Sequence, residues 1–484
     1  MTTQTQKKYE TVIGLEVHLQ LKTNTKIFCG CANEFGHEPN SHTCPVCLGL
    51  PGTLPVVNKK ALEYAVKIGL ALDCKINPYV KFDRKNYYYP DLPKGYQISQ
   101  FDLPICSQGH LDIPLDKGEI KRIRINRAHL EEDAGKLIHD DHHDSSLVDY
   151  NRTGTPLLEI VTEADLRSSE EAYSYLNTLK LVLQYLDVSD CDMEKGSLRC
   201  DANVSIRPMG EEKFGTKTEL KNMNSFRAVK VAIDYEVSRH TKVRESGEKI
   251  IQETRLWDEA KQMTITMRSK EEAHDYRYFP EPDLVPFLIE QKTITDIKNN
   301  LPELPQAKLD RFIKQYHLSE YDGRIIVQEK KTADYFEACA KLYNDTKKIC
   351  NWLNGAVLNE MNSRKSDIGS LNLSPSELIT LIKKVDEDIL SNLVAKDVLK
   401  TIIDTGKSVE AVIQEQGLAQ VSDDSALLAI VDQVISENPN IVTQIKEGKE
   451  QAAGFLVGQA MKKSQGKANP KKIGELIKRR LSNG

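Results

Sequence analysis

Hydrophobic and polar residues alternate along several segments within the first 290 residues. Residues 14–21, 198–206 and 216–221 repeat with a period of two, so that apolar side chains fall on one face and polar side chains on the other. Such segments predict strands with one buried and one solvent-facing side, which is typical of an antiparallel sheet. Helical patterns intervene at residues 59–72 and after Ser225, a residue type that caps helices. The region is therefore α+β. The polar faces of its predicted strands hold Glu16, His18, Gln20, Arg199, Asp201, Asn203, Ser205, Lys217, Glu219 and Lys221.

The rest of the chain has the periodicity of helices. Beyond residues 301–305 aromatic residues become rarer, and Pro375 between two serines is typical of a helix start. Leu427, Val431 and Val434 form an apolar stripe that indicates a further small helical bundle. We predict three domains: an α+β domain at residues 1–290, a helical domain at 291–408 and a helical tail at 409–484.

Composition and charge narrow the class of protein. Of the 484 residues, 39% are hydrophobic and 28% are charged, which is typical of a globular protein, and there is no apolar run of about 18 residues that would cross a membrane. The N-terminus has no apolar core of a signal peptide, so we expect a cytoplasmic protein with no membrane contact. The net charge is −5, but residues 454–484 hold eight basic residues and one acidic residue, +7, which leaves −12 for the rest. A basic end of this kind suits a polyanionic partner; alternatively it is a solvated helix face.

Four of the ten cysteines lie between Cys29 and Cys47. Cys29 and Cys31 form one pair, Cys44 and Cys47 form a second, and twelve residues separate the pairs. Two close pairs joined by a loop allow four thiolates to converge on Zn²⁺. Because sulfur would fill all four positions, such a zinc ion would be structural; the alternative is two incidental thiol pairs.

Several carboxylates have the spacing or setting of metal ligands. Glu16 and His18 share one face of a predicted strand at about 7 Å between their Cα atoms. Glu159 interrupts the apolar run 157–161, and Glu131 and Glu132 follow another strand-like segment. Carboxylates and an imidazole that converge would suit Mg²⁺ carrying nucleotide phosphates. The alternative is that each acid is solvated or ion-paired.

Basic residues also stand among aromatic ones. In residues 82–97, Lys85 and Lys94 lie in a context rich in Tyr, Pro and Gly, which would place ammonium groups to meet phosphates or stacked bases. The alternative is a structural loop. The histidine-rich run 139–144 resembles a metal motif, but its position between strands favours a solvated hairpin tip.

Taken together, these segments resemble the B subunits of the bacterial GatCAB aspartyl/glutamyl-tRNA amidotransferases. The resemblance covers nearly the whole chain in the order of that family. The segments that carry it are residues 14–18, 82–91, 129–136, 151–159, 196–205 and 274–283, and, in a tail that resembles the YqeY domain, 454–459 and 468–470.

The resemblance implies a fold and an activity. The first domain would be a catalytic cradle similar to glutamine synthetase and the guanido kinases, with a zinc-binding insertion at about 29–47, and the tail would bind tRNA. The activity would be that of a glutamine-hydrolysing ligase, which uses ATP to phosphorylate the Asp or Glu side chain on misacylated tRNA(Asn) or tRNA(Gln). Ammonia from a partner amidase, the A subunit of such complexes, would then form Asn-tRNA or Gln-tRNA. A small C subunit would bridge the two larger ones.

The resemblance also implies site residues. Glu16, His18, Glu131 and Glu159 match the family's magnesium ligands, with Glu132 as the alternative to Glu131. Lys85 and Lys94 match lysines that act on phosphate or at the ammonia-receiving end, so that the catalytic residues would be Lys85, Lys94, Glu16 and Glu159. The nucleotide-binding set would be Lys85, Lys94, Lys217, Asp201 and Asn203, and the structural zinc would lie on Cys29, Cys31, Cys44 and Cys47.

Two other classes of function are open to such a chain. One is a zinc-stabilised tRNA-binding adaptor without catalysis, which would leave the carboxylates on the strands without a purpose. The other is a self-contained glutamine-dependent enzyme. The sequence holds no Ser or Cys nucleophile motif with a base, and this argues against the second class.

Overall fold

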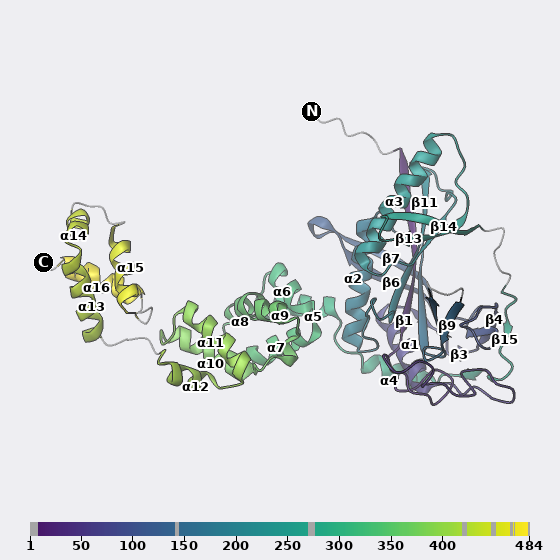
Figure 1. Cartoon of the computed structure of the whole chain (residues 1–484), viewed down its shortest axis with the longest axis horizontal. Helices are drawn as coiled ribbons and strands as arrows, with labels where there is room; N and C mark the ends of the chain where they lie inside the picture. Colours follow the sequence, from purple (N-terminus) through teal and green to yellow (C-terminus); the bar gives the residue numbers. More distant parts are fainter. Residues whose placement is uncertain are drawn as a thin grey trace. The chain divides into compact units, whose positions relative to one another are not determined.

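The computed structural model (Figure 1) describes residues 8–140, 145–269, 276–418, 424–446, 452–464, 468 and 470–482. The chain divides into two compact units, Met1–Leu304 and Pro305–Gly484. The first unit extends beyond the predicted boundary at residue 290, because Ile294 of the helix that follows is buried in the core of this unit.

The first unit combines strands with four helices among its described residues. The helices are α1 (Lys59–Ala71), α2 (Ser169–Leu186), α3 (Phe226–Glu245) and α4 (Gln291–Asn299). The strands are β1 (Tyr9–Gln20), β2 (Lys75–Ile76), β3 (Tyr79–Val80), β4 (Asp83–Asn86), β5 (Tyr96–Ser99), β6 (Cys106–Pro114), β7 (Ile120–Glu132), β8 (Lys136–Asp140), β9 (Ser145–Asp149), β10 (Pro156–Thr162), β11 (Leu198–Pro208), β12 (Thr218–Lys221), β13 (Glu253–Asp258), β14 (Met263–Ser269), β15 (Phe279–Pro280) and β16 (Phe287–Leu288).

A nine-stranded sheet organises this unit, in the order β14-β13-β12-β11-β1-β10-β7-β6-β2. All its strand pairs are antiparallel except β12 and β13, which are parallel. The α+β class with a mainly antiparallel sheet is therefore confirmed. Small sheets form from β15, β4 and β5, from β16 and β3, and from β8 and β9.

The two faces of the large sheet differ in the way that the alternation predicts. Leu15, Val17 and Leu19 of β1 are fully buried in the core that also contains α1, α2 and α3. Glu16 and His18 point to the opposite face, because side chains alternate along a strand. That opposite face gathers the polar residues of β1, β7, β10, β11 and β12.

Local capping signals in the sequence are confirmed. The predicted helix at 59–72 is α1, and Ser225 caps α3 by accepting a hydrogen bond of 3.0 Å from the backbone N–H of Ala228. Ser374 caps α10 (Pro375–Asp386) in the same way, with Pro375 in its first turn.

The second unit is helical throughout its described residues and has two apolar cores. The predicted stripe Leu427, Val431 and Val434 is confirmed as the centre of the second core. No helix within the described ranges combines the length and the apolar character that crossing a membrane requires. Besides α10, its helices are α5 (Pro305–Tyr316), α6 (Glu320–Val327), α7 (Lys330–Ala340), α8 (Thr346–Trp352), α9 (Leu358–Arg364), α11 (Asn392–Thr405), α12 (Val409–Gln416), α13 (Asp424–Glu437), α14 (Pro439–Lys446), α15 (Ala453–Lys463) and α16 (Pro470–Ser482).

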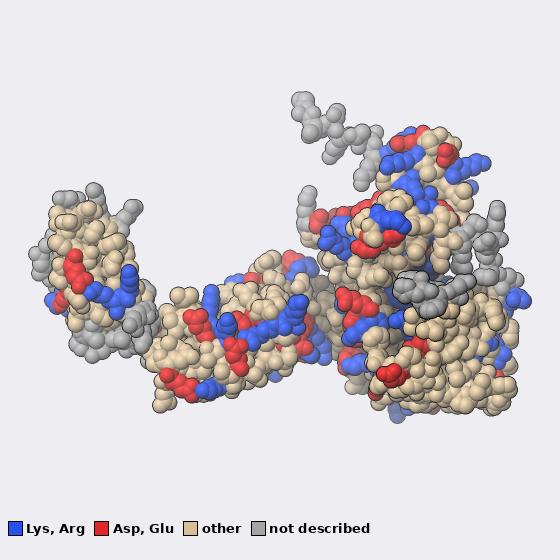
Figure 2. All heavy atoms as spheres, in the orientation of Figure 1, with Lys and Arg blue, Asp and Glu red and all other residues tan. Residues whose placement is uncertain are grey.

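The loop between β1 and α1 holds the four clustered cysteines. It runs along the lower edge of the first unit in Figure 1, and Figure 2 shows few charged atoms over the lower right part of that unit. Phe35, Leu54 and Val56 of this loop are large apolar residues that are exposed by 75%, 64% and 74%.

Two sequence segments fall partly outside the described residues. Strands β8 and β9 pair as a hairpin from Lys136 and Asp149 to Asp140 and Ser145, but residues 141–144 of the predicted hairpin tip are outside. His274 and Asp275 of the segment 274–283 are outside as well.

Candidate active site

The polar face of the large sheet brings three predicted ligands together. His18 of β1 pairs with Glu159 of β10, and Glu131 comes from the next strand, β7. The imidazole Nε2 of His18 lies 3.9 Å from Glu131 Oε1 and 3.8 Å from Glu159 Oε2. One ligand atom from each residue lies within 4.8 Å of the other two, so these three side chains, here the carboxylate–histidine group, have the spacing of a metal site.

A second histidine holds the two acids ionised. His129 of β7 is buried, and its Nε2 lies 3.1 Å from Glu159 Oε2 and 3.6 Å from Glu131 Oε2. Burial is the largest single influence and raises the pKa values of Glu131 and Glu159. The hydrogen bonds from His129, together with the positive charges of His129 and Lys85 and, for Glu159, of His18, outweigh burial and lower both pKa values. Burial likewise lowers the pKa of His129, and its hydrogen bonds to Glu131 and Glu159 raise that pKa to about 9.

Glu16 belongs to a neighbouring set of acids. The sequence predicts that Glu16 shares one ion with His18, Glu131 and Glu159, but the structure groups it with Asp201 and Glu219, whose ligand oxygens all lie within 4.8 Å of one another. The reason is strand pairing, since Glu16 lies opposite Asp201 on β11, which brings Glu219 of β12 alongside. We call these three the acidic group.

Three polar neighbours hold the acidic group. Asn203 donates to Glu16 Oε1 at 2.9 Å, and Thr254 donates to Glu219 Oε2 at 2.8 Å. Lys221 lies 2.9 Å from Glu219 Oε1 and also pairs with Asp201. Burial, and then the charge of Glu159, raise the pKa of Glu16.

The structure places the three lysines predicted for nucleotide contacts differently from one another. Lys85 of β4 lies with its Nζ 4.8 Å from the ring centroid of Tyr276. Burial lowers its pKa, but the charges of Glu131, of two tyrosines and of Glu159 outweigh burial and raise it. Lys217 is exposed immediately before β12, and the neighbouring Lys221 is the lysine that contacts the acidic group.

Lys94 belongs to neither group of acids. Its ammonium pairs with Glu132, a residue 2% exposed whose Oε1 also accepts a hydrogen bond of 2.9 Å from the N–H of Ile98. A cavity of about 150 Å³ contains this pair and is also lined by Phe28, Cys29, Cys47 and Tyr96. Glu131, and not Glu132, is therefore the member of this acidic pair that joins His18 and Glu159, because adjacent residues of β7 point to opposite faces.

The four cysteines converge as predicted. The sulfur atoms of Cys29, Cys31, Cys44 and Cys47 all lie within 4.8 Å of one another. Tetrahedral Zn²⁺ with bonds of about 2.3 Å needs sulfur atoms about 3.8 Å apart, so this donor set fits the ion. The hydrogen bond with Cys29, and then backbone contacts and the charge of Lys26, outweigh burial and lower the pKa of Cys47 to about 4. In the same cluster the hydrogen bond with Cys47 raises the pKa of Cys29, and burial raises the pKa of Cys31, so the thiolate is favoured at Cys47 and not at these two cysteines.

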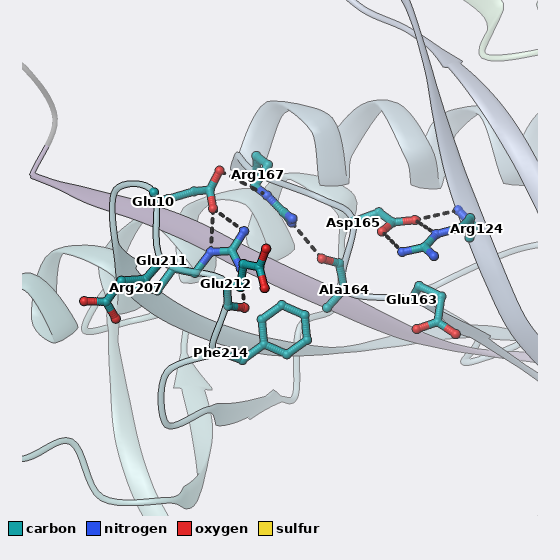
Figure 3. Close-up of a pocket in the computed structure, with 11 residues that line it drawn as sticks. Glu10, Arg124, Glu163, Ala164, Asp165, Arg167, Arg207, Glu211, Glu212 and Phe214 are labelled. Atoms are coloured by element: carbon teal, nitrogen blue, oxygen red, sulfur yellow. Dashed lines mark hydrogen bonds and ion pairs between the residues drawn. The ribbon is translucent and has the colours of Figure 1, made fainter.

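A cavity of about 420 Å³ lies elsewhere in the first unit (Figure 3). Its arginines are engaged by its own acids: Arg207 and Arg167 pair with Glu10, and Arg124 pairs with Asp165. Since its cations are already neutralised, this cavity lacks the free positive charge that a phosphate site requires.

Sequence reasoning missed several residues of these groups. Glu219 and Lys221 stand out in the sequence only as polar positions of a strand, and His129 only as part of a motif. Their contribution follows from which strands are neighbours, and alternation within one strand does not report that.

Comparison with known proteins identifies the family of the chain. Residues 11–295 match the family described as the GatB/GatE catalytic domain, and residues 334–481 match the family described as the GatB domain. The chain is 53% identical over 479 residues to the aspartyl/glutamyl-tRNA(Asn/Gln) amidotransferase B subunit of Carboxydothermus hydrogenoformans, covering 98% of this chain and 99% of the relative. It is 55% identical over 475 residues to the protein of the same name from Thermoanaerobacter sp. (strain X514), covering 98% and 100%. The chain belongs to the family of aspartyl/glutamyl-tRNA(Asn/Gln) amidotransferase B subunits.

Proposed function

We propose that this chain is the component of a tRNA-dependent, glutamine-hydrolysing amidotransferase that activates the amino acid. It would use ATP to phosphorylate the side-chain carboxylate of Asp or Glu on misacylated tRNA(Asn) or tRNA(Gln), and ammonia would then convert this carboxylate into the amide. The observation that carries the proposal is the pair of possible ligand groups on one face of the sheet.

The chemistry explains why such a site is needed. Ammonia does not displace oxide from a carboxylate, so one oxygen must first become a leaving group. Transfer of the terminal phosphoryl group of ATP to that oxygen gives an acyl phosphate and ADP. The nitrogen of ammonia then attacks the acyl carbon, the carbon–oxygen bond to phosphate breaks, and the nitrogen loses a proton as the amide forms.

The residues of the polar face can divide this work. Bound Mg²⁺ would neutralise phosphate charge and align the phosphoryl group with the attacking carboxylate. The acidic group, with oxygen ligands only, fits Mg²⁺ best, and the carboxylate–histidine group adds an imidazole to two carboxylates. Lys85 would balance negative charge on the phosphates, while Asn203 and Lys221 would hold Glu16, Asp201 and Glu219 in place.

The proposed reaction needs partner subunits. A partner amidase, the A subunit of the complex, would supply ammonia and a small C subunit would join the two, in the cytoplasm. All six cysteines outside the cluster are buried, so none is placed to attack glutamine. The exposed apolar residues of the cysteine loop, such as Phe35 and Val56, have the character of a protein contact surface.

The fold supports further assignments of the proposal. The cradle, which the first unit extends to Leu304, would share its architecture with glutamine synthetase and the guanido kinases. The helical domain would begin at Pro305, and residues 409–484 would contact tRNA. In the tail Arg480 pairs with Asp432 and Lys463 with Glu437, so part of its positive charge is neutralised internally. Zinc on the four cysteines would stabilise the fold and take no part in the reaction.

The test is ADP formation by the chain assembled with its two partners, on Asp-tRNA and Glu-tRNA, with and without glutamine. We expect ADP to form only with a misacylated tRNA, and the amide only when glutamine or ammonia is also present. tRNA binding without tRNA-dependent ADP formation would instead identify a zinc-stabilised adaptor.

A further inference from the structure

A fully buried lysine lies against the cysteine cluster. Lys26 is 0% exposed, and its Nζ lies 2.7 Å from the carbonyl oxygen of His42, 3.5 Å from that of Tyr150 and 3.6 Å from the sulfur of Cys47. Among the residues that the structure describes, no carboxylate lies within ion-pair distance of this ammonium. In contrast, two other lysines with little exposed side chain each pair with a carboxylate: Lys94 with Glu132 and Lys308 with Asp334.

Burial without a counter-charge is unfavourable for an ammonium group. Two carbonyl dipoles satisfy hydrogen bonds but carry no net charge, so an anion is needed close by. The neighbour that can supply it is the cysteine cluster, because one divalent ion on four thiolates leaves a formal charge of about −2. The cluster in turn gains from a buried cation, since its own excess charge lies in a partly buried loop.

We propose that Lys26 is the buried counter-cation of the four-cysteine metal site, and that burial of this ammonium and binding of zinc stabilise each other. Lys26 touches the metal ligand and not the metal, so it is a positioning residue. The inference rests on the proposed zinc site and on no step of the amidation reaction.

The same contacts link the metal site to the sheet. The N–H of Ile27 donates to the carbonyl of Gly154 at 2.8 Å, and a Cβ placed on Gly154 would lie 3.5 Å from Cys47 Cβ and 3.6 Å from Lys26 Cδ. Gly154 has a φ of +81° and stands two residues before β10, the strand that carries Glu159. Lys26 therefore sits between the zinc loop and the turn that starts a strand of the candidate active site.

The first test is zinc affinity of the full chain with Lys26→Met, measured by competition with a chromogenic chelator under reducing conditions. Removing a group that supports metal ligands weakens affinity by about 10- to 100-fold, and we expect a loss in this range. Lys67→Met is the matched control, because Lys67 is a half-buried lysine of α1 whose Nζ also donates to a carbonyl, that of Leu186. Wild-type zinc affinity in Lys26→Met would overturn the proposal, whereas a wild-type chain that binds no zinc would overturn the zinc site itself.

The second test separates charge coupling from general packing. With zinc bound, Lys26→Met should lower the melting temperature; with zinc removed by a chelator, it should lower it less or raise it, because the ammonium has then lost its counter-charge. Equal losses in both conditions would assign Lys26 a packing role only. If the zinc-free chains do not fold, the zinc concentration at the midpoint of refolding should be higher for Lys26→Met by the same factor as its loss of affinity.

Discussion

Two glutamates, the buried Glu236 and the half-buried Glu159, lie beside histidines on opposite faces of one sheet, yet their surroundings differ. Glu236 of α3 is 0% exposed and meets His240 at 3.0 Å, Thr264 at 3.0 Å and the guanidinium of Arg239. Its oxygens are therefore fully used by groups of this chain. Glu159 meets only the imidazoles of His129 and His18 among the described residues, and its side chain is 12% exposed.

The difference shows how a structural acid is told apart from a candidate ligand. Both carboxylates have a lowered pKa and a histidine partner. Arg239 and His240 contact Oε1 of Glu236, and Thr264 donates to its Oε2, so both oxygens are engaged by groups of this chain. Glu159 and Glu131 instead share the two imidazoles of His18 and His129 and have no cationic side chain within ion-pair distance apart from these among the described residues. Unfilled coordination, and not the presence of acids and histidines, distinguishes the carboxylate–histidine group from Glu236 and its partners.

The largest expected effect is the loss of amide formation when Glu159 is replaced, a loss that replacement of Glu236 should not cause. Glu159→Gln keeps an oxygen for His129 but removes a charged ligand, so we expect amide formation to fall by about a hundred- to a thousandfold while cooperative unfolding is retained. Glu163→Gln is the control, because Glu163 is close in sequence, accepts a hydrogen bond from Asn126 and belongs to neither ligand group. Wild-type turnover of Glu159→Gln would remove Glu159 from the site.

The Lys94–Glu132 pair provides the next test, on the boundary between structural and functional acids. Lys94→Met leaves the buried carboxylate of Glu132 without its cation, and breaking such a pair costs about 3–5 kcal/mol of unfolding free energy. Adding Glu132→Gln should restore most of that loss, because the amide oxygen can still accept from Ile98.

Urea denaturation of the single and double variants measures this recovery. A stable double variant with wild-type amide formation would show that Lys94 serves only the fold. A stable double variant without amide formation would assign Lys94 to the reaction, as its sequence context predicts.

A smaller effect is expected from the pH dependence of Glu236. Burial raises its pKa, but the bonds to His240 and Arg239 outweigh burial and lower it from the ordinary 4.5 to about 2. A carboxyl with a depressed folded pKa contributes stability above its unfolded pKa and loses it as pH falls through the folded value. Stability should therefore decrease between about pH 4.5 and 2, by about 3 kcal/mol from this group.

Glu236→Gln isolates that contribution. The difference in unfolding free energy between wild type and variant should be largest near neutral pH and shrink toward pH 2. Amide formation by the folded variant should match wild type, since Glu236 lies on the helix-covered face. A difference that does not depend on pH would contradict the assigned charge interactions.

A site whose residues are close in sequence can be predicted most directly. The cysteine cluster could be predicted from spacing, because Cys29 to Cys47 belong to one loop. The polar faces of β1 and β11 could also be predicted, since alternation is a property of each strand alone. The carboxylate–histidine group depends on β1, β10 and β7 being neighbours, which pairing over long sequence separations decides.

The family resemblance supplied His18, Glu131 and Glu159 as a set, but it left the choice between Glu131 and Glu132 open. The structure separates them by the direction of adjacent side chains on β7. It also places Glu16 opposite Asp201 of β11, so that Glu16 lies with Asp201 and Glu219, while His18, Glu131 and Glu159 lie with one another. Lys94 was predicted to lie at the site because it stands in the same Tyr-rich segment as Lys85. In the structure it pairs with Glu132 in a separate cavity.

The smallest expected effect concerns the two lysines around β12. Lys217 is exposed before the strand, so Lys217→Ala should change unfolding free energy by less than about 0.5 kcal/mol and leave the KM for ATP near its wild-type value. Lys221→Ala removes the cation shared by Asp201 and Glu219, so these acids should repel each other and the KM for ATP should change. Steady-state ADP formation with saturating misacylated tRNA measures the KM for ATP of both variants. A raised KM in Lys217→Ala, with Lys221→Ala unaffected, would place the nucleotide outside the acidic group and over the start of β12.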